Sequence, residues 1–149
     1  PYDTYKQTRG KEVIKFAVWR DPVERLVSCY KYFCLEKWYR HYFHFLDLYR
    51  EPTFDHFMMF VRFELDKKCI ILQDEHIRRQ SDFYSPDDVD FIVPIKKLDT
   101  FLQKYNVPIQ YGLKNSTHVD FKLDNEEYIN EIRELYRADY EILNSTKYI

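Results

Sequence analysis

The chain has 149 residues, of which 45% are hydrophobic and 19% are aromatic, enough apolar material for one buried core. Its formal net charge of −2 argues against a general nucleic-acid binder, since such proteins usually carry a strongly basic surface. The sequence contains no long apolar run of about eighteen residues and no secretory leader, which predicts a cytoplasmic protein with no membrane segment.

The first two predicted elements are a strand and a helix that meet at Arg20. Residues 14–19 form an apolar run typical of a buried strand. Asp21 is then suited to cap a helix, Pro22 to open it, and Glu24 to return to the cap as the second arm of a capping box. The strand therefore brings Arg20 to a helix N-terminus, where free backbone N–H groups and the helix dipole favour a phosphate.

Arg20, Glu24 and Ser28 recur at a spacing of four residues, so they can share one helix face. The planar guanidinium of Arg20 carries donors that match phosphate oxygens. The pattern indicates an anion site, and the alternative is an ordinary capped helix with Arg20 in a surface ion pair.

Helical spacing of apolar residues continues to about residue 49, where the run Glu-Pro-Thr at positions 51–53 interrupts it. A second helix is predicted from Phe54 to about Leu65, with Thr53 as its cap. Aromatic residues and histidines are dense between positions 38 and 60. They form either a sugar-stacking wall or a core between helices, and we favour the core for most of them.

A polar loop follows at positions 73–82, and its charged and amide side chains are Asp74, Glu75, His76, Arg78, Arg79 and Gln80. His76 is the side chain most easily tuned as a base near neutral pH, and Arg78 or Arg79 can hold an acidic sugar. The alternative is a solvated loop whose charges pair with each other at little net gain.

A second strand is predicted at positions 88–94 and its helix at 98–105, an alternation that favours an α/β sheet over a helix bundle. The last helix is predicted to follow a capping box at Asp124, with an apolar stripe of Ile129, Ile132, Leu135 and Tyr136. Three cysteines, Cys29, Cys34 and Cys69, have no metal-ligand spacing and are expected to be buried free thiols.

The joint reads Arg20-Asp21-Pro22 with Arg25 and Ser28 after it. It closely resembles the 3′-phosphate-binding motif of sulfotransferases, Arg-Asp-Pro-x-x-Arg-x-x-Ser, in the form typical of the Golgi-type carbohydrate sulfotransferase family. In that family the residues corresponding to Arg20 and Ser28 hold the 3′-phosphate of the donor, 3′-phosphoadenosine-5′-phosphosulfate. The resemblance implies that Arg20, Arg25 and Ser28 bind this donor.

Three later parts of the chain resemble the same family in the same order. Positions 74–80 are similar to its Asp-Glu-His-Trp-x-Pro-Gln segment, although Ile77 and Arg79 replace the usual Trp and Pro. The second strand with its helix is similar to the family's next unit, and positions 134–142 are similar to its closing Leu-Tyr-x-x-Asp-Phe/Tyr-Glu helix. The two departures bear on the acceptor more than on the donor.

The resemblance implies a P-loop-NTPase-like sulfotransferase fold, α/β in class, with a central parallel sheet flanked by helices. Residues 1–149 would be one domain, the C-terminal major part of a sulfotransferase domain. The family's Lys-x-Gly-x-(Ser/Thr) loop for the 5′-phosphosulfate does not occur in this sequence. We therefore expect a preceding segment to be missing, and a Golgi location if that segment carries an anchor.

The implied reaction is sulfuryl transfer to a hydroxyl of a carbohydrate or glycoconjugate, without a metal. His76 is the expected base, with Glu75 and His118 as alternatives. Arg78, Arg79 and Gln80 are expected to bind the acceptor, and the loop residues Lys114, Asn115 and Ser116 to contact the donor. Two alternatives remain open: an aromatic-rich carbohydrate-binding or interaction module, and a nucleotide or phosphate kinase, which would need a phosphate loop and Mg²⁺ ligands.

Overall fold

The structure is a computed structural model that describes residues 13–36, 51–107 and 119–149. Strand β1 (Phe16–Trp19) runs directly into helix α1 (Pro22–Tyr30), as predicted. Asp21 caps this helix, because its Oδ1 accepts hydrogen bonds from the backbone N–H groups of Val23 (2.9 Å) and Glu24 (3.1 Å). The α-helix ends earlier than expected, and a π-helical turn, Lys31–Leu35, follows it. Positions 37–50 lie outside the described residues.

Helix α3 (Phe54–Asp66) begins as predicted after Thr53. The Thr53 hydroxyl accepts from the N–H of His56 (3.4 Å), while the Thr53 N–H donates to His56 Nδ1 (3.2 Å). These two bonds close a capping box and fix where the helix starts.

The second half of the chain contains β2 (Phe91–Pro94), α4 (Leu98–Lys104), α5 (Glu126–Leu135) and α6 (Arg137–Glu141). Strand β2 is shorter than predicted because a 3₁₀ turn, Pro86–Asp88, precedes it. The cap of α5 is Asn125 and not Asp124. Asn125 Oδ1 accepts from the Glu127 N–H (2.8 Å), whereas the Asp124 carboxylate pairs with Lys122 (2.7 Å).

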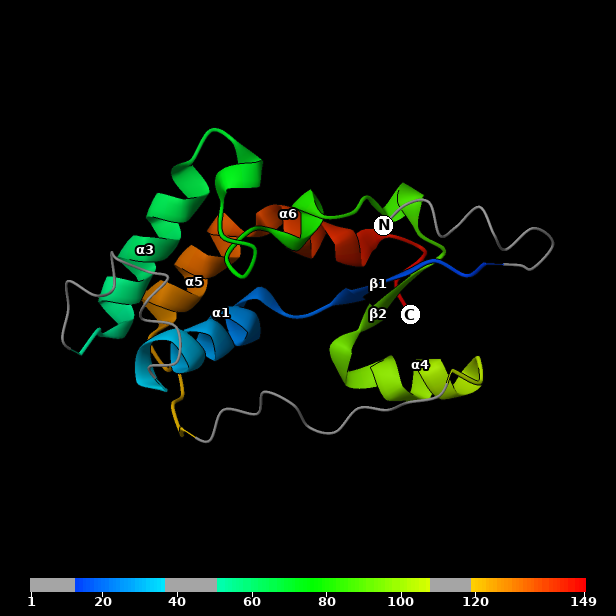
Figure 1. Cartoon of the computed structure of the whole chain (residues 1–149), viewed down its shortest axis with the longest axis horizontal. Coiled ribbons are helices and arrows are strands. Elements are labelled where there is room, and N and C mark those ends of the chain that lie inside the picture. Colours follow the sequence, from blue (N-terminus) through cyan, green and yellow to red (C-terminus); the bar gives the residue numbers. More distant parts are fainter. Residues whose placement is uncertain (1–12, 37–50, 108–118) are drawn as a thin grey trace.

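The two strands are parallel, and their register pairs Phe16 with Phe91 and Trp19 with Pro94. Near the C-terminus Tyr148 forms a further parallel bridge to Ile92. Helix α4 lies on one side of the strands and α6 on the other (Figure 1). The described part of the chain is therefore a mixed helical and β structure, broadly α/β in class.

Successive residues of β2 point to opposite faces of the sheet, and both faces are covered. Val93 packs with Phe101 and Leu102 of α4, while Ile92 packs with Trp19 and Ile142.

Strand β1 differs from the prediction of a buried strand. Ile14 and Phe16 are 41% and 38% exposed, and within the strand only Trp19 is buried. Open hollows reach both side chains, since Ile14 and Phe16 line one hollow and Phe16 also lines a second.

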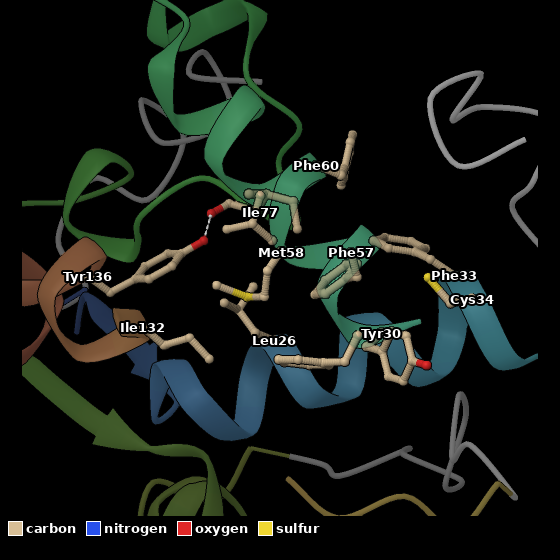
Figure 2. Close-up of a cluster of buried hydrophobic side chains, with 12 residues drawn as sticks. Leu26, Tyr30, Phe33, Cys34, Phe57, Met58, Phe60, Ile77, Ile132 and Tyr136 are labelled. Atoms are coloured by element: carbon tan, nitrogen blue, oxygen red, sulfur yellow. Dashed lines mark hydrogen bonds between the residues drawn. The ribbon is translucent and has the colours of Figure 1, made fainter. Parts of the chain in front are cut away.

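The main core lies between α1, α3 and α5 (Figure 2). Leu26 and Tyr30 of α1 face Phe57 and Met58 of α3, and Ile132 of α5 closes the cluster. Phe54, Phe57 and Phe60 of α3 are buried in this cluster and therefore form a core and not a sugar-binding wall. The remaining aromatic residues of that stretch lie outside the described residues.

The apolar stripe of the last helix and the three cysteines are less buried than predicted. In the apolar stripe of the last helix, Ile132 and Tyr136 are fully buried, whereas Ile129 and Leu135 are only partly buried. Cys29, Cys34 and Cys69 are free thiols, but only Cys34 is buried; Cys29 is partly buried, and Cys69 is exposed, so the expectation of burial was wrong for Cys69. Within the described residues, no helix combines the length and the apolar character needed to cross a bilayer.

Candidate functional site

The joint between β1 and α1 is held by the side chain of Gln80, which is buried. The Arg20 N–H donates to Gln80 Oε1 (2.9 Å), and Gln80 Nε2 donates to the Arg20 carbonyl (2.8 Å). The amide of Gln80 thus satisfies both backbone groups of Arg20, as a neighbouring strand would. This pairing fixes the backbone from which the Arg20 guanidinium extends.

Gln80 is held in turn by Asp139, which is fully buried. The Asp139 carboxylate accepts from the N–H groups of Gln80 and Ser81, both at 2.9 Å. The carbonyl of Asp139 accepts from Trp19 Nε1 (3.1 Å). Three segments far apart in sequence therefore meet at one place: the strand-to-helix joint, the end of the polar loop, and the middle of α6.

The N-terminus of α1 does not offer the free backbone donors that the sequence predicted. Pro22 has no N–H, and the N–H groups of Val23 and Glu24 are both taken by Asp21 Oδ1. The other carboxylate oxygen of Asp21 accepts from the Tyr140 hydroxyl (3.2 Å). An anion at this joint would therefore be bound by side chains and not by the end of the helix.

Two side chains of the predicted anion site remain available. Both Arg20 and Ser28 are partly buried, and in the described part of the chain neither the Arg20 guanidinium nor the Ser28 hydroxyl has a hydrogen-bond or ion-pair partner. Glu24, which lies one helical turn before Ser28, does not return to the cap as expected. Its carboxylate pairs with Lys96 Nζ at 2.5 Å.

Arg25 is used differently from Arg20. Its guanidinium donates to the carbonyls of Arg78 (2.7 Å) and Glu75 (3.0 Å) and so fastens the polar loop to α1. Charge-assisted bonds of this kind are stronger than neutral ones. Arg25 therefore positions the loop, and each of its two terminal nitrogens already donates to a loop carbonyl.

The polar loop contains a His–Asp pair. His76 Nδ1 lies 3.0 Å from Asp74 Oδ1, and the same oxygen accepts from the His76 N–H (2.9 Å). The hydrogen bond that the His76 ring donates to Asp74 raises the pKa of His76 above its ordinary value. The His76 carbonyl accepts from Cys29 Sγ (3.6 Å), which places the pair beside α1.

Asp74, and not Glu75, is thus the carboxylate that orients His76. The sequence reasoning missed this role, although Asp and His two residues apart in a turn are the signal for it, since an Asp side chain often bonds to the backbone two residues on. Burial raises the pKa of Asp74, but the hydrogen bonds from the His76 ring and backbone outweigh it, and the net pKa is lowered.

The residues predicted to bind an acceptor mostly bind the protein itself. Arg78 donates to the Gln73 carbonyl (3.0 Å) and lies over the Phe83 ring, 5.0 Å from its centroid. Arg79 Nε donates to the Leu135 carbonyl (2.8 Å). With Gln80 they build the site, and a contact to a substrate stays a prediction. Lys114, Asn115, Ser116 and His118 lie outside the described residues.

A hollow of about 410 Å³ runs along β1 and ends at Arg25 and Gln80. Its walls are mainly apolar and aromatic, and the lining residues are Phe16, Ala17, Val18, Phe83, Tyr84 and Val89. The Tyr84 hydroxyl is buried, and within the described residues it has no hydrogen-bond partner. Burial, and secondarily the charge of Asp139, raise the pKa of Tyr84 to about 12. Apolar walls with a few polar groups are typical of ligand sites.

Comparisons with models of protein families, with curated proteins and with solved structures found no match to this chain. Among the described residues, no three His, Cys, Asp or Glu side chains are grouped so as to hold a metal ion. The chemistry of the joint, the polar loop and the hollow is therefore what points to a function.

Proposed function

We propose that this protein is a sulfotransferase that moves a sulfuryl group from 3′-phosphoadenosine-5′-phosphosulfate to a hydroxyl of a carbohydrate or glycoconjugate. The observation that carries the proposal is the contact between the separate segments that resemble this family. Arg20 at the joint, Gln80 at the end of the polar loop and Asp139 in the middle of α6 form one hydrogen-bonded chain. A chance resemblance of short motifs would not require these residues to touch.

The donor's 3′-phosphate would be bound by Arg20 and Ser28. The guanidinium of Arg20 can give two parallel hydrogen bonds to phosphate oxygens, and the Ser28 hydroxyl can give a third. Because Gln80 already holds the backbone of Arg20, less conformational freedom is lost on binding. The cap made by Asp21 explains why the phosphate would depend on these two side chains.

His76 would act as the base. When bound, the donor supplies a sulfuryl group whose bond to the bisphosphate oxygen breaks as the acceptor oxygen bonds to sulfur. A carboxylate only accepts hydrogen bonds, so Asp74 keeps the hydrogen on His76 Nδ1 and leaves Nε2 to take the hydroxyl proton. The backbone of His76 is held beside α1 by Cys29, the neighbour of Ser28, and its ring packs edge-on against Phe33.

Calorimetry with adenosine 3′,5′-bisphosphate tests the proposal, with 5′-AMP as the control ligand. We expect a preference for the bisphosphate that falls by about tenfold or more in Arg20→Ala and somewhat less in Ser28→Ala. Arg133→Ala removes an exposed arginine of α5 and should leave binding unchanged. Equal binding of 5′-AMP, or full affinity in Arg20→Ala, would overturn the proposal.

Two other outcomes would point to the other classes of function. Mg²⁺-dependent binding of ATP would favour a kinase. Binding of an oligosaccharide without any nucleotide binding would favour a carbohydrate-binding module.

A further inference from the structure

The carboxyl ends of the two strands bring a second cation to the anion site. Because β1 and β2 are parallel and Trp19 pairs with Pro94, the residues that follow each strand emerge at the same edge of the sheet. Arg20 follows β1, and Lys96 follows β2 in the 3₁₀ turn Ile95–Lys97. Ligands of open α/β sheets usually bind outside this edge.

One ion pair shows where the Lys96 side chain lies. Its Nζ is 2.5 Å from Glu24 Oε1, and Glu24 precedes Ser28 by one turn of α1. The ammonium group is therefore held at the helix face that also carries Ser28. The carboxylate of Asp21 is engaged elsewhere, in the helix cap and with the Tyr140 hydroxyl.

The pair between Lys96 and Glu24 is suited to exchange. The two side chains are 74% and 43% exposed, and exposed ion pairs of this kind contribute little net free energy. A phosphate dianion carries more charge than the Glu24 carboxylate and can replace it as the partner of Lys96. Once displaced, the partly exposed Glu24 side chain can rotate into solvent.

We propose that Lys96 binds the phosphate together with Arg20 and Ser28, and that Glu24 competes with the phosphate for Lys96. The proposal rests on the proposed function in one respect, namely that Arg20 and Ser28 bind an anion. It adds a residue that the sequence reasoning did not single out, because Lys96 and Glu24 are 72 positions apart. Glu24 would then lower the affinity of the empty site for weakly charged anions.

The test measures affinity for adenosine 3′,5′-bisphosphate in the Lys96→Met, Lys97→Met and Glu24→Gln variants of the full chain. Lys97 is the matched control, since it is the next residue in the same turn and is exposed. We expect Lys96→Met to weaken binding about fivefold and Lys97→Met to change it by less than about twofold.

Glu24→Gln should strengthen binding about threefold, and by less when combined with Lys96→Met. The salt dependence of binding should also be shallower in Lys96→Met. Thermal unfolding of each variant checks that the fold is intact. Equal effects of Lys96→Met and Lys97→Met would overturn the proposal, as would weaker binding in Glu24→Gln with an unchanged thermal midpoint.

Inorganic phosphate, as a second probe, separates this proposal from the proposed function. If wild-type protein does not prefer the bisphosphate to 5′-AMP but Lys96→Met still weakens phosphate binding, the anion site stands and the sulfotransferase does not. If the bisphosphate is preferred and Lys96→Met binds like wild type, only the role of Lys96 fails. If neither anion binds, both proposals fail.

Discussion

Replacing Gln80 by alanine should loosen the joint that carries Arg20. The substitution removes the two hydrogen bonds to the Arg20 backbone, at 2.9 and 2.8 Å, and leaves those partly buried groups without partners. Each bond contributes about 1 kcal/mol, and the unpaired groups and lost packing add a similar amount. We therefore expect the free energy of unfolding to fall by about 2–4 kcal/mol, a large share of a typical domain's stability of about 5–15 kcal/mol.

Gln80→Glu offers a matched variant of nearly the same shape. The new carboxyl oxygen would face two acceptors, the Arg20 carbonyl and an Asp139 oxygen now 3.4 Å from Gln80 Nε2. Repulsion there raises the pKa of the new carboxyl in the folded protein above its unfolded value of about 4.3. The loss of stability relative to wild type should thus be smallest below pH of about 4.3 and grow as pH rises through the folded pKa.

Urea unfolding followed by circular dichroism measures both variants, with Gln103→Ala on the exposed surface of α4 as the control. The slope of the free energy against urea should stay unchanged, because the same core is exposed on unfolding. Bisphosphate binding should weaken in Gln80→Ala at temperatures where the protein is fully folded. A loss within about 0.5 kcal/mol of the control would refute the reasoning that Gln80 holds the joint.

Three other predictions follow from the contacts and the shifted pKa values. An NMR titration should place the pKa of His76 above 6.5, because the hydrogen bond to Asp74 favours the charged ring. Asp74→Asn should lower that pKa. A pKa at or below 6.5 in wild type would contradict this prediction. The stability from that pair should be present below pH 6.5 and be lost as pH rises through the His76 pKa. Tyr136→Phe should lower the free energy of unfolding in urea by about 1–2 kcal/mol, because the buried Tyr136 hydroxyl donates to the Ile77 carbonyl at 2.6 Å. A change near zero would argue against that hydrogen bond. A thiol reagent at pH 8 should label the exposed Cys69 before Cys29, since burial raises the pKa of Cys29 to about 11. Mass spectrometry follows the labelling, and faster labelling of Cys29 would contradict the prediction.

Local signals in the sequence predicted the elements that carry the site. Asp21 and Pro22 start a helix in almost any context, since a cap and a fixed φ act within a few residues. The same is true of Thr53, whose capping box begins α3. The predicted positions of Arg20 and Ser28 on one stretch of strand and helix follow from these short-range effects.

The partners of these residues depended on the tertiary structure. Gln80 binds the Arg20 backbone across 60 positions, and Asp139 binds Gln80 across 59. No periodicity or spacing in a single sequence reports which distant amide meets which backbone group, so these roles were not predicted from the residues alone. For the same reason Gln80 was expected to contact a substrate.

By itself, then, the sequence determined the starts of α1 and α3 and the motif before α1, because hydrogen bonds between near neighbours decide them. Only the tertiary structure decided which donors stay available. Arg25 binds carbonyls of the polar loop and Glu24 pairs with Lys96, and both contacts join residues more than 50 positions apart. What remains open to an anion is set by that competition among charged groups and not by the order of the residues.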